Sequence, residues 1–143
     1  MSVAQAVIDT NVLVAAGINA GGKPAQVLAA VERLMLQPVV SAEVMVEYRA
    51  VLMRPQFHFQ AAWIDGLLDT FDALGLRLEP APIDTALLPD PSDAPFIALA
   101  LQVGCPVITG NTRHFPARTG AAVLTPAQWV ESFIQPAINR AAE

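Results

Sequence analysis

Three acidic residues occupy positions from which they could hold a metal ion. Asp9 directly follows an apolar segment, and Asp93 lies at the start of another. Glu47 lies six residues beyond Ser41, on a segment with helical apolar spacing. Three carboxylates brought together would repel one another, and at least one would keep its proton, unless a cation lay among them. Because hard oxygen ligands suit Mg²⁺ or Mn²⁺, the pattern predicts a divalent-metal site.

Each acid also has a purely structural explanation. Aspartates are favoured at helix N-caps, so Asp9 and Asp93 could each cap a helix. Glu47 could be a solvated helix residue beside Arg49. The apolar residues on both sides of Glu47 argue against that explanation, because an acid among apolar neighbours needs a partner.

Polar residues also follow a later apolar segment. Thr109 and Asn111 begin a polar stretch that continues to His114. Thr10, Asn11, Thr109 and Asn111 are placed to position waters or a phosphate. Asn111 could instead be an ordinary turn residue, since asparagine tolerates left-handed backbone conformations. His114 could be a packed or hydrogen-bonded histidine.

Short apolar segments alternate with segments of helical spacing along the chain. The short segments predict strands at residues 3–8, 38–41, 76–79, 106–109 and 121–124. Apolar residues three and four apart predict helices after Asp9, over 24–36, after Ser41, over 61–74, and from Asp93 and Pro126. This alternation predicts a parallel sheet with helices on both faces. Ligands of such sheets bind beyond the C-terminal strand ends, where Asp9 and Asn111 fall.

Length, charge and hydropathy exclude several classes of protein. The chain has 143 residues, 54% of them hydrophobic, and we expect a single domain over residues 1–143. The net charge of −5 excludes a polybasic nucleic-acid binder. No apolar stretch approaches the ~20 residues of a membrane span, despite a mean hydropathy of +0.45. With no export signal and one cysteine, the sequence predicts a cytoplasmic protein.

Four blocks of sequence, in their order and spacing, resemble the PIN-domain family of metal-dependent ribonucleases, which includes the VapC-type toxins of toxin–antitoxin pairs. The blocks are Val7–Leu13, Ser41–Glu47, Asp90–Asp93 with Phe96–Ala100, and Val107–Asn111 with His114 and Phe115. The fold implied by the resemblance is a three-layer α/β/α sandwich with a central, mainly parallel sheet of four to five strands. That fold agrees with the alternation of strands and helices above.

The resemblance also implies roles for individual residues. It makes Asp9, Glu47 and Asp93 both the catalytic residues and the ligands of Mg²⁺ or Mn²⁺. The expected auxiliary residues are Asn11, Thr109, Asn111 and His114, and the expected RNA contacts are Arg49 and Arg113. Many members of the family carry a fourth acid at the position of Asn111 or His114. This chain has an acid at neither position, which weakens the case for a second metal ion.

The implied function is that of an endoribonuclease that hydrolyses RNA phosphodiester bonds and leaves 5′-phosphate and 3′-hydroxyl ends. The implied partners are an antitoxin protein and a second copy of the chain in a homodimer. A catalytically inactive PIN-like module that binds RNA or protein is the alternative. Metal binding at the three acids separates the two hypotheses. An aspartyl-phosphate phosphatase with Asp9 as nucleophile is disfavoured, because Asn11 stands where that chemistry usually places a second aspartate.

Overall fold

A five-stranded parallel sheet forms the centre of the molecule. The computed structural model describes residues 3–142, and its strands are ordered β3-β2-β1-β4-β5, with every neighbouring pair parallel. The strands are β1 (Ala4–Ile8), β2 (Leu36–Val40), β3 (Leu76–Arg77), β4 (Val107–Ile108) and β5 (Val123–Leu124). The predicted fold class, an α/β/α sandwich around a parallel sheet of four to five strands, is confirmed.

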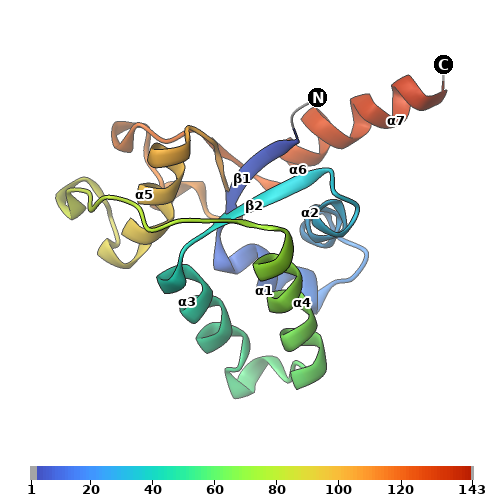
Figure 1. Cartoon of the computed structure of the whole chain (residues 1–143), viewed down its shortest axis with the longest axis horizontal. Coiled ribbons are helices and arrows are strands. Elements are labelled where there is room, and N and C mark those ends of the chain that lie inside the picture. The colour runs from blue at the N-terminus through green and yellow to red at the C-terminus, as the bar shows by residue number, and fades with distance from the viewer. Residues whose placement is uncertain (1–2, 143) are drawn as a thin grey trace.

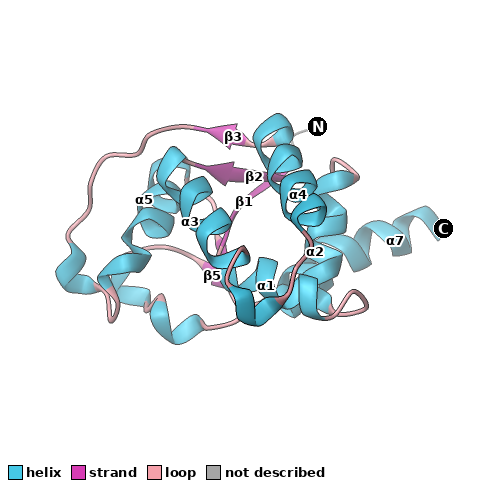
Figure 2. Cartoon of the chain, turned by 90° about the horizontal axis from the view of Figure 1, so that it is seen from below, coloured by secondary structure: helices cyan, strands magenta, loops and turns pink. Residues whose placement is uncertain are grey.

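Helices connect the strands and cover the sheet (Figure 1; Figure 2). The α-helices are α1 (Thr10–Ile18), α2 (Lys23–Glu32), α3 (Ala42–Leu52), α4 (Ala61–Leu74), α5 (Ala94–Val103), α6 (Pro126–Trp129) and α7 (Gln135–Ala142), with a π-helical turn at Val130–Ile134. In Figure 1, α5 lies on one side of β1 and β2 and α2 on the other. No helix among residues 3–142 is long and apolar enough to cross a membrane.

The end of α2 differs from the prediction. The apolar spacing predicted a helix as far as residue 36, but α2 ends at Glu32. Leu34 adopts a left-handed backbone conformation with φ of 62°, and the N–H of Met35 donates to the carbonyl of Ala30 at 2.9 Å. These features stop the helix, and Leu36 pairs with Ala4 as the first residue of β2. The helical apolar spacing continued as far as Leu36 because this residue is also buried, but as part of the sheet and not of the helix.

The core lies on both sides of β1 and β2. Ala6, Val7 and Ile8 of β1 and Val39 and Val40 of β2 have no exposed surface. Complete burial explains why these strands are continuously apolar rather than alternating. Each buried aliphatic side chain of the size of valine or isoleucine contributes roughly 1.5–3 kcal/mol.

The sheet order places the ends of β1 and β4 next to each other. Val7 pairs with Val107 and Ile8 with Ile108. The residues that follow, Asp9 and Thr109, therefore leave neighbouring strands at the same edge. The chain reverses its direction of winding between β1 and β4, which is where open parallel sheets bind ligands.

Candidate metal centre

Asp9 leaves β1 and lies against β4. Its N–H donates to the carbonyl of Ile108 at 2.9 Å, and the residue is 8% exposed. Oδ2 accepts a hydrogen bond of 2.8 Å from the Thr109 hydroxyl, whereas the side chain makes no cap bond to α1. Asp9 therefore occupies the N-cap position of α1 without capping the helix through its side chain. Burial raises the pKa of the Asp9 carboxyl, and the Thr109 bond opposes that rise.

The Thr109 hydroxyl has a complete set of hydrogen-bond partners. It donates to Asp9 and accepts from Asn11 Nδ2 at 3.3 Å and from the N–H of Asn111 at 3.0 Å. A hydroxyl has one proton and two lone pairs, so these bonds saturate it. Asn11 Oδ1 also accepts from the N–H of Gly110 at 3.1 Å. Three of the expected auxiliary residues thus form one network beside Asp9.

Glu47 is linked to the same network through Thr10, the residue after Asp9. The Thr10 hydroxyl donates to Glu47 Oε2 at 2.7 Å. Arg49 does not neutralise Glu47, since it forms an exposed ion pair with Asp65 at 2.8 Å. Glu47 is half-buried, and its hydrogen-bond partner is Thr10 rather than its neighbour Arg49. Burial raises the pKa of Glu47, with the charge of Asp9 adding to the rise and the Thr10 bond opposing it.

Tyr48 fixes α3 against the end of β1. The side chain is fully buried, and its hydroxyl donates to the carbonyl of Ile8. Its ring packs against Phe71 and Phe96. Burial raises the pKa of Tyr48 well above its ordinary value, so the hydroxyl stays protonated and remains a donor. This contact sets the position of Glu47, the preceding residue, relative to Asp9.

Asp93 ends a short 3₁₀ turn (Pro91–Asp93) that leads into α5. It is 9% exposed and occupies the N-cap position of α5 without a side-chain cap bond. Its Oδ2 is buried and has no hydrogen-bond partner among the described residues. Burial, followed by the charges of Asp9 and Asp90, raises the pKa of Asp93 to about 6.

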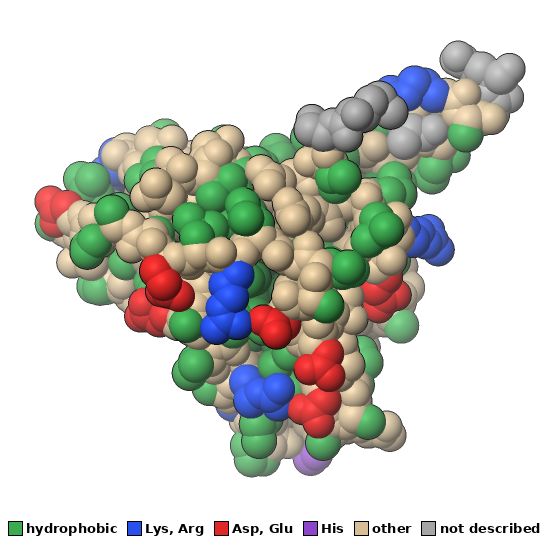
Figure 3. Space-filling model, viewed as in Figure 1, with side chains coloured by type: hydrophobic (Ala, Val, Ile, Leu, Met, Phe, Trp, Pro, Cys, Tyr) green, Lys and Arg blue, Asp and Glu red, His purple; other side chains and the backbone are tan. Residues whose placement is uncertain are grey.

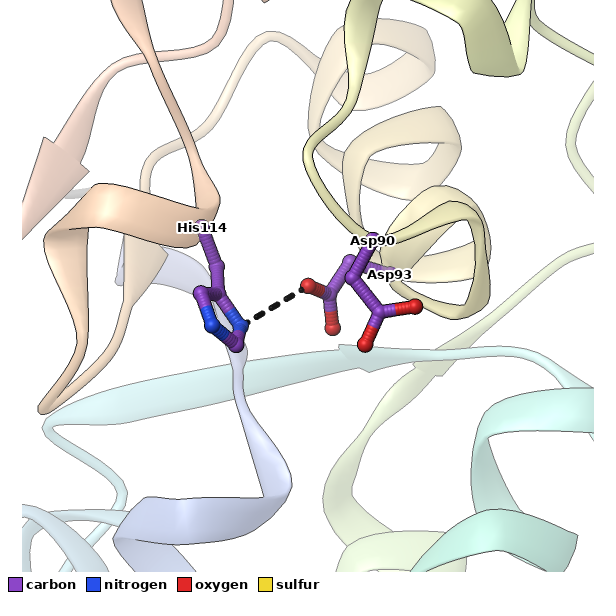
Figure 4. Close-up of side chains that lie close together, drawn as sticks. All are labelled: Asp90, Asp93 and His114. Carbon is purple, nitrogen blue, oxygen red and sulfur yellow. Dashed lines mark ion pairs between the residues drawn. The ribbon is translucent and has the colours of Figure 1, made fainter.

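Asp90 and His114 approach Asp93 from two different segments (Figure 4). His114 Nδ1 lies 3.2 Å from Asp93 Oδ2. Asp90 is held in a turn, where its Oδ1 accepts bonds from the N–H of Ser92 at 3.0 Å and its hydroxyl at 2.8 Å. Each of the three residues offers one ligand atom, and these atoms all lie within 4.8 Å of one another.

The structure therefore groups the predicted acids in two ways. Asp9, Glu47 and Asp93 lie near enough that the charges of Asp9 and Glu47 raise the pKa of Asp93. The compact set of ligand atoms, however, joins Asp93 to Asp90 and His114, while Asp9 and Glu47 are each bonded to a threonine hydroxyl. Asp90 was not one of the three predicted ligands, although its closeness to Asp93 in sequence made it a possible contributor. Its spacing of three residues from Asp93, with Pro91 between them, was the available signal, because that spacing allows a single tight turn.

The two arginines predicted to contact RNA lie on the surface. Arg113 is exposed in the 3₁₀ turn Thr112–His114, and Arg49 is committed to its ion pair with Asp65. In Figure 3, basic and acidic side chains lie side by side over α3 and α4, in agreement with this pair and with the pair between Arg77 and Asp72 at 2.8 Å.

A groove of about 630 Å³ adjoins the acids. It lies between α3 and α5, and residues of the connection from β3 to α5 form part of its wall. Glu43, Glu47 and Glu79 supply acidic side chains to its wall, and proline, valine and phenylalanine side chains supply an apolar lining. The groove therefore combines negative charge with apolar surface next to Glu47.

Comparison with known protein families identifies the family of the chain. Residues 5–113 match the PIN domain. The chain belongs to the PIN-domain family. The match includes Asp9, Glu47, Asp93 and Thr109, and it ends one residue before His114. Members of the PIN-domain family are generally nucleases.

A solved structure supports the same fold. The PIN domain described here resembles a structure described as FitAB bound to an IR36 DNA fragment, with 18% sequence identity and a TM-score of 0.53. The alignment covers 84% of this chain and 94% of the other. No curated protein matches the chain in sequence.

The residues of this PIN domain fit a divalent cation. The donor set consists of carboxylate oxygens with one imidazole nitrogen nearby, and the buried Asp93 Oδ2 lacks a donor. A positive ion would satisfy that oxygen and relieve the repulsion among the acids. The same repulsion makes the cluster unfavourable as a purely structural feature.

Proposed function

We propose that this PIN domain is an endoribonuclease that depends on Mg²⁺ or Mn²⁺ and hydrolyses RNA phosphodiester bonds. The observation that carries the proposal is the convergence of Asp9, Glu47 and Asp93 beyond the strand ends, where burial raises the pKa of each carboxyl and the charge of Asp9 raises the pKa of Glu47 and of Asp93 further. Titratable groups whose pKa values are shifted in this way, in a region where ligands bind, are candidates for a functional role.

The protein's own residues orient the three acids. Thr109 holds the Asp9 carboxylate, Thr10 holds that of Glu47, and Tyr48 fixes the helix that carries Glu47. Asp9, Glu47 and Asp93 would hold a divalent ion, which would activate a water and neutralise charge on the phosphorane-like transition state. No serine or cysteine nucleophile is then required.

The test is cleavage of a fluorescently labelled single-stranded RNA by purified protein with Mg²⁺. We expect Asp9→Asn and Asp93→Asn to abolish cleavage, because each removes a negative oxygen from the centre. The matched control is Asp69→Asn, an exposed acid on α4, which should cleave normally. Circular dichroism shows whether each variant is folded. Undiminished cleavage by both folded variants would overturn the proposal.

We further propose that the protein is a toxin whose antitoxin covers the groove beside Glu47. The acidic and apolar lining of that groove suits a segment with basic and apolar side chains. Co-expression with the product of the adjacent gene, followed by co-purification, tests this partner. We also propose a cytoplasmic homodimer, which light scattering coupled to gel filtration measures.

A second candidate function is a PIN-like module without catalysis that binds RNA or protein. Asn111 and His114 favour it, since neither supplies a fourth negative charge. Calorimetric titration with MgCl₂ separates the candidates. Mg²⁺ binding that disappears in Asp9→Asn supports the nuclease, whereas RNA binding without Mg²⁺ binding supports the module.

A further inference from the structure

We propose that Arg54 and Phe57, at the turn between α3 and α4, form a subsite for single-stranded RNA beyond the candidate metal centre, with one base stacked on the Phe57 ring and one phosphate beside the Arg54 guanidinium. The proposal rests on the proposed function for the class of its ligand, RNA. Binding at the subsite is measured without metal, so it is a property separate from cleavage.

Three aromatic rings lie in series at this turn. Phe57 ends the 3₁₀ turn Pro55–Phe57 and stacks on Phe59, with ring centroids 5.5 Å apart and 16° between the ring planes. Phe59 in turn packs against Trp63 of α4, with centroids 5.0 Å apart. Between the two phenylalanines, His58 adopts a left-handed backbone conformation with φ of 54°. The chain turns there, and the two phenylalanine rings come face to face.

Packing explains the two inner rings but not the outer one. Phe59 and Trp63 pack against the hydrophobic core, and they fill the space beside Gly17 of α1, where a Cβ would lie 2.7 Å from the Phe59 ring. Among the described residues, Phe57 is not one of the side chains that pack against the core, and it is partly exposed. Phe59 covers one face of Phe57, and the ring keeps exposed aromatic surface on which a base can stack.

The first helix connects the aromatic rings to the candidate metal centre. Thr10, at the start of α1, is bonded to Glu47, and Gly17, seven residues later, lies against the rings of Phe59 and Trp63. Seven residues of α-helix span about 10 Å, at about 1.5 Å per residue. The rings therefore lie only a few nucleotides from the acids, so one strand of RNA can reach both.

Arg54 supplies a positive charge between the acids and the rings. It is exposed, it lies three residues before Phe57, and no acid among the described residues forms an ion pair with it. Burial raises the pKa of Glu47, and the charge of Arg54 opposes that rise, so its field reaches the candidate metal centre. Arg49, by contrast, is paired with Asp65. Arg54 is therefore available to a phosphate of a strand that crosses the centre.

The distribution of charge along α3 favours this route for the strand. Glu43 and Glu79 line the groove beside Glu47 and repel phosphates there. Arg54 lies just beyond the opposite end of α3, where α3 and α4 join far from the sheet (Figure 1). A strand leaving the centre is thus repelled from the groove and attracted toward Arg54 and Phe57.

The probe is a single-stranded oligoribonucleotide in which uridine alternates with the fluorescent base 2-aminopurine. It is added to the full chain in EDTA at low ionic strength, where no metal-dependent cleavage occurs. Stacking on an aromatic ring quenches this fluorescence, so the native protein should quench the probe as it binds. We expect Phe57→Ala to lower the affinity about 5- to 150-fold and to remove most of the quenching, whereas Phe57→Trp should retain both.

Phe133→Ala is the matched control for loss of an aromatic ring. Phe133 is also an exposed phenylalanine that stacks on a second ring, that of Trp129, with centroids 5.4 Å apart. It lies in the π-helical turn near the end of the chain. The variant should bind and quench the probe as the native protein does. Circular dichroism shows whether each variant is folded.

Arg54→Gln tests the phosphate contact. The plot of log affinity against log salt concentration should become shallower by about 0.7, the value for one phosphate of a single strand. Arg33→Gln, which removes an exposed charge at the end of α2, should leave the slope unchanged.

Four results would overturn the subsite. They are a native protein that does not quench the probe, a Phe57→Ala variant that binds and quenches like the native protein, a Phe133→Ala variant that loses as much affinity as Phe57→Ala, and an unchanged salt slope in Arg54→Gln. RNA cleavage by a native protein that does not quench would refute the subsite and leave the nuclease standing. Quenching by a protein that does not cleave RNA would support the subsite and refute the nuclease.

Discussion

The Thr109 hydroxyl donates its single proton to Asp9 Oδ2 across the adjoining ends of β4 and β1, over 2.8 Å. The direction of this bond is fixed, because the two lone pairs of the hydroxyl accept from Asn11 and Asn111. The Thr109 hydroxyl therefore stabilises the negative charge of Asp9, and it cannot rotate toward another acceptor without breaking the network.

Replacement of Thr109 by valine should make Asp9 harder to ionise. Thr109→Val keeps the shape of the side chain but removes the donor, so burial raises the pKa of Asp9 further. The midpoint of the pH profile of Mg²⁺-dependent cleavage should move upward. Stability should fall by about 1–3 kcal/mol because a buried acceptor is left without a partner.

Thr109→Ser is the matched control for this prediction. Serine retains the hydroxyl and loses only a methyl group, so the pH profile should stay close to that of the native protein. Identical pH midpoints for the valine and serine variants would contradict the role assigned to the Thr109 hydroxyl.

Tyr48→Phe should loosen the attachment of α3 to β1. The variant loses the hydrogen bond to the Ile8 carbonyl but keeps the packing against Phe71 and Phe96. We expect a loss of about 1–2 kcal/mol in the free energy of unfolding, measured with urea. An unchanged free energy of unfolding would show that the bond contributes nothing to stability.

The stability of the metal-free protein should depend on pH through Asp93. The folded protein keeps the Asp93 proton up to a pKa of about 6, while the ordinary value is 3.8. The stabilisation that protonated Asp93 gives the folded protein is therefore fully present below about pH 4, and it is lost as the pH rises to 6. Asp93→Asn should reduce that fall in urea titrations between pH 4 and 6. An equally steep fall in the variant would contradict the prediction.

The glycine within α4 and the glycine that follows it should respond in opposite directions to alanine. A Cβ at Gly75 would collide with the Phe71 carbonyl oxygen and lie 3.0 Å from that of Pro38, so Gly75→Ala forces backbone to move and should destabilise the fold. A Cβ at Gly66 in α4 meets nothing within 4 Å. Gly66→Ala should stabilise by about 0.5–1 kcal/mol through helix propensity. Thermal unfolding of both variants measures the contrast.

Much of the fold could be predicted because its signals are local. The buried strand before Asp9 and the helix over residues 61–74 are marked by uninterrupted apolar residues and by apolar spacing, respectively. These local signals do not give the order of the strands, which only the structure shows. The end of α2 could not be predicted, because Leu34 adopts a left-handed conformation that no residue type at that position indicates.

The candidate site was only partly predictable for a related reason. Sequence position placed Asp9 and Thr109 at strand ends, but it could not show that they share a hydrogen bond, since they are 100 residues apart. N-capping by Asp9 and Asp93 was a reasonable alternative from residue type alone. The structure places both at N-cap positions, but neither side chain makes a capping bond. The approach of Asp90 and His114 likewise depends on two turns meeting in space.

The connection between β3 and α5 divides the residues of the candidate metal centre into an earlier and a later group along the chain. Asp9 and Glu47 precede it, and Asp93 and Thr109 follow it. Because β4 is inserted beside β1 late in the chain, a growing polypeptide on the ribosome has two of the acids long before it has the third acid and the Thr109 donor. The proposed centre is thus incomplete until the later portion of the chain has been made.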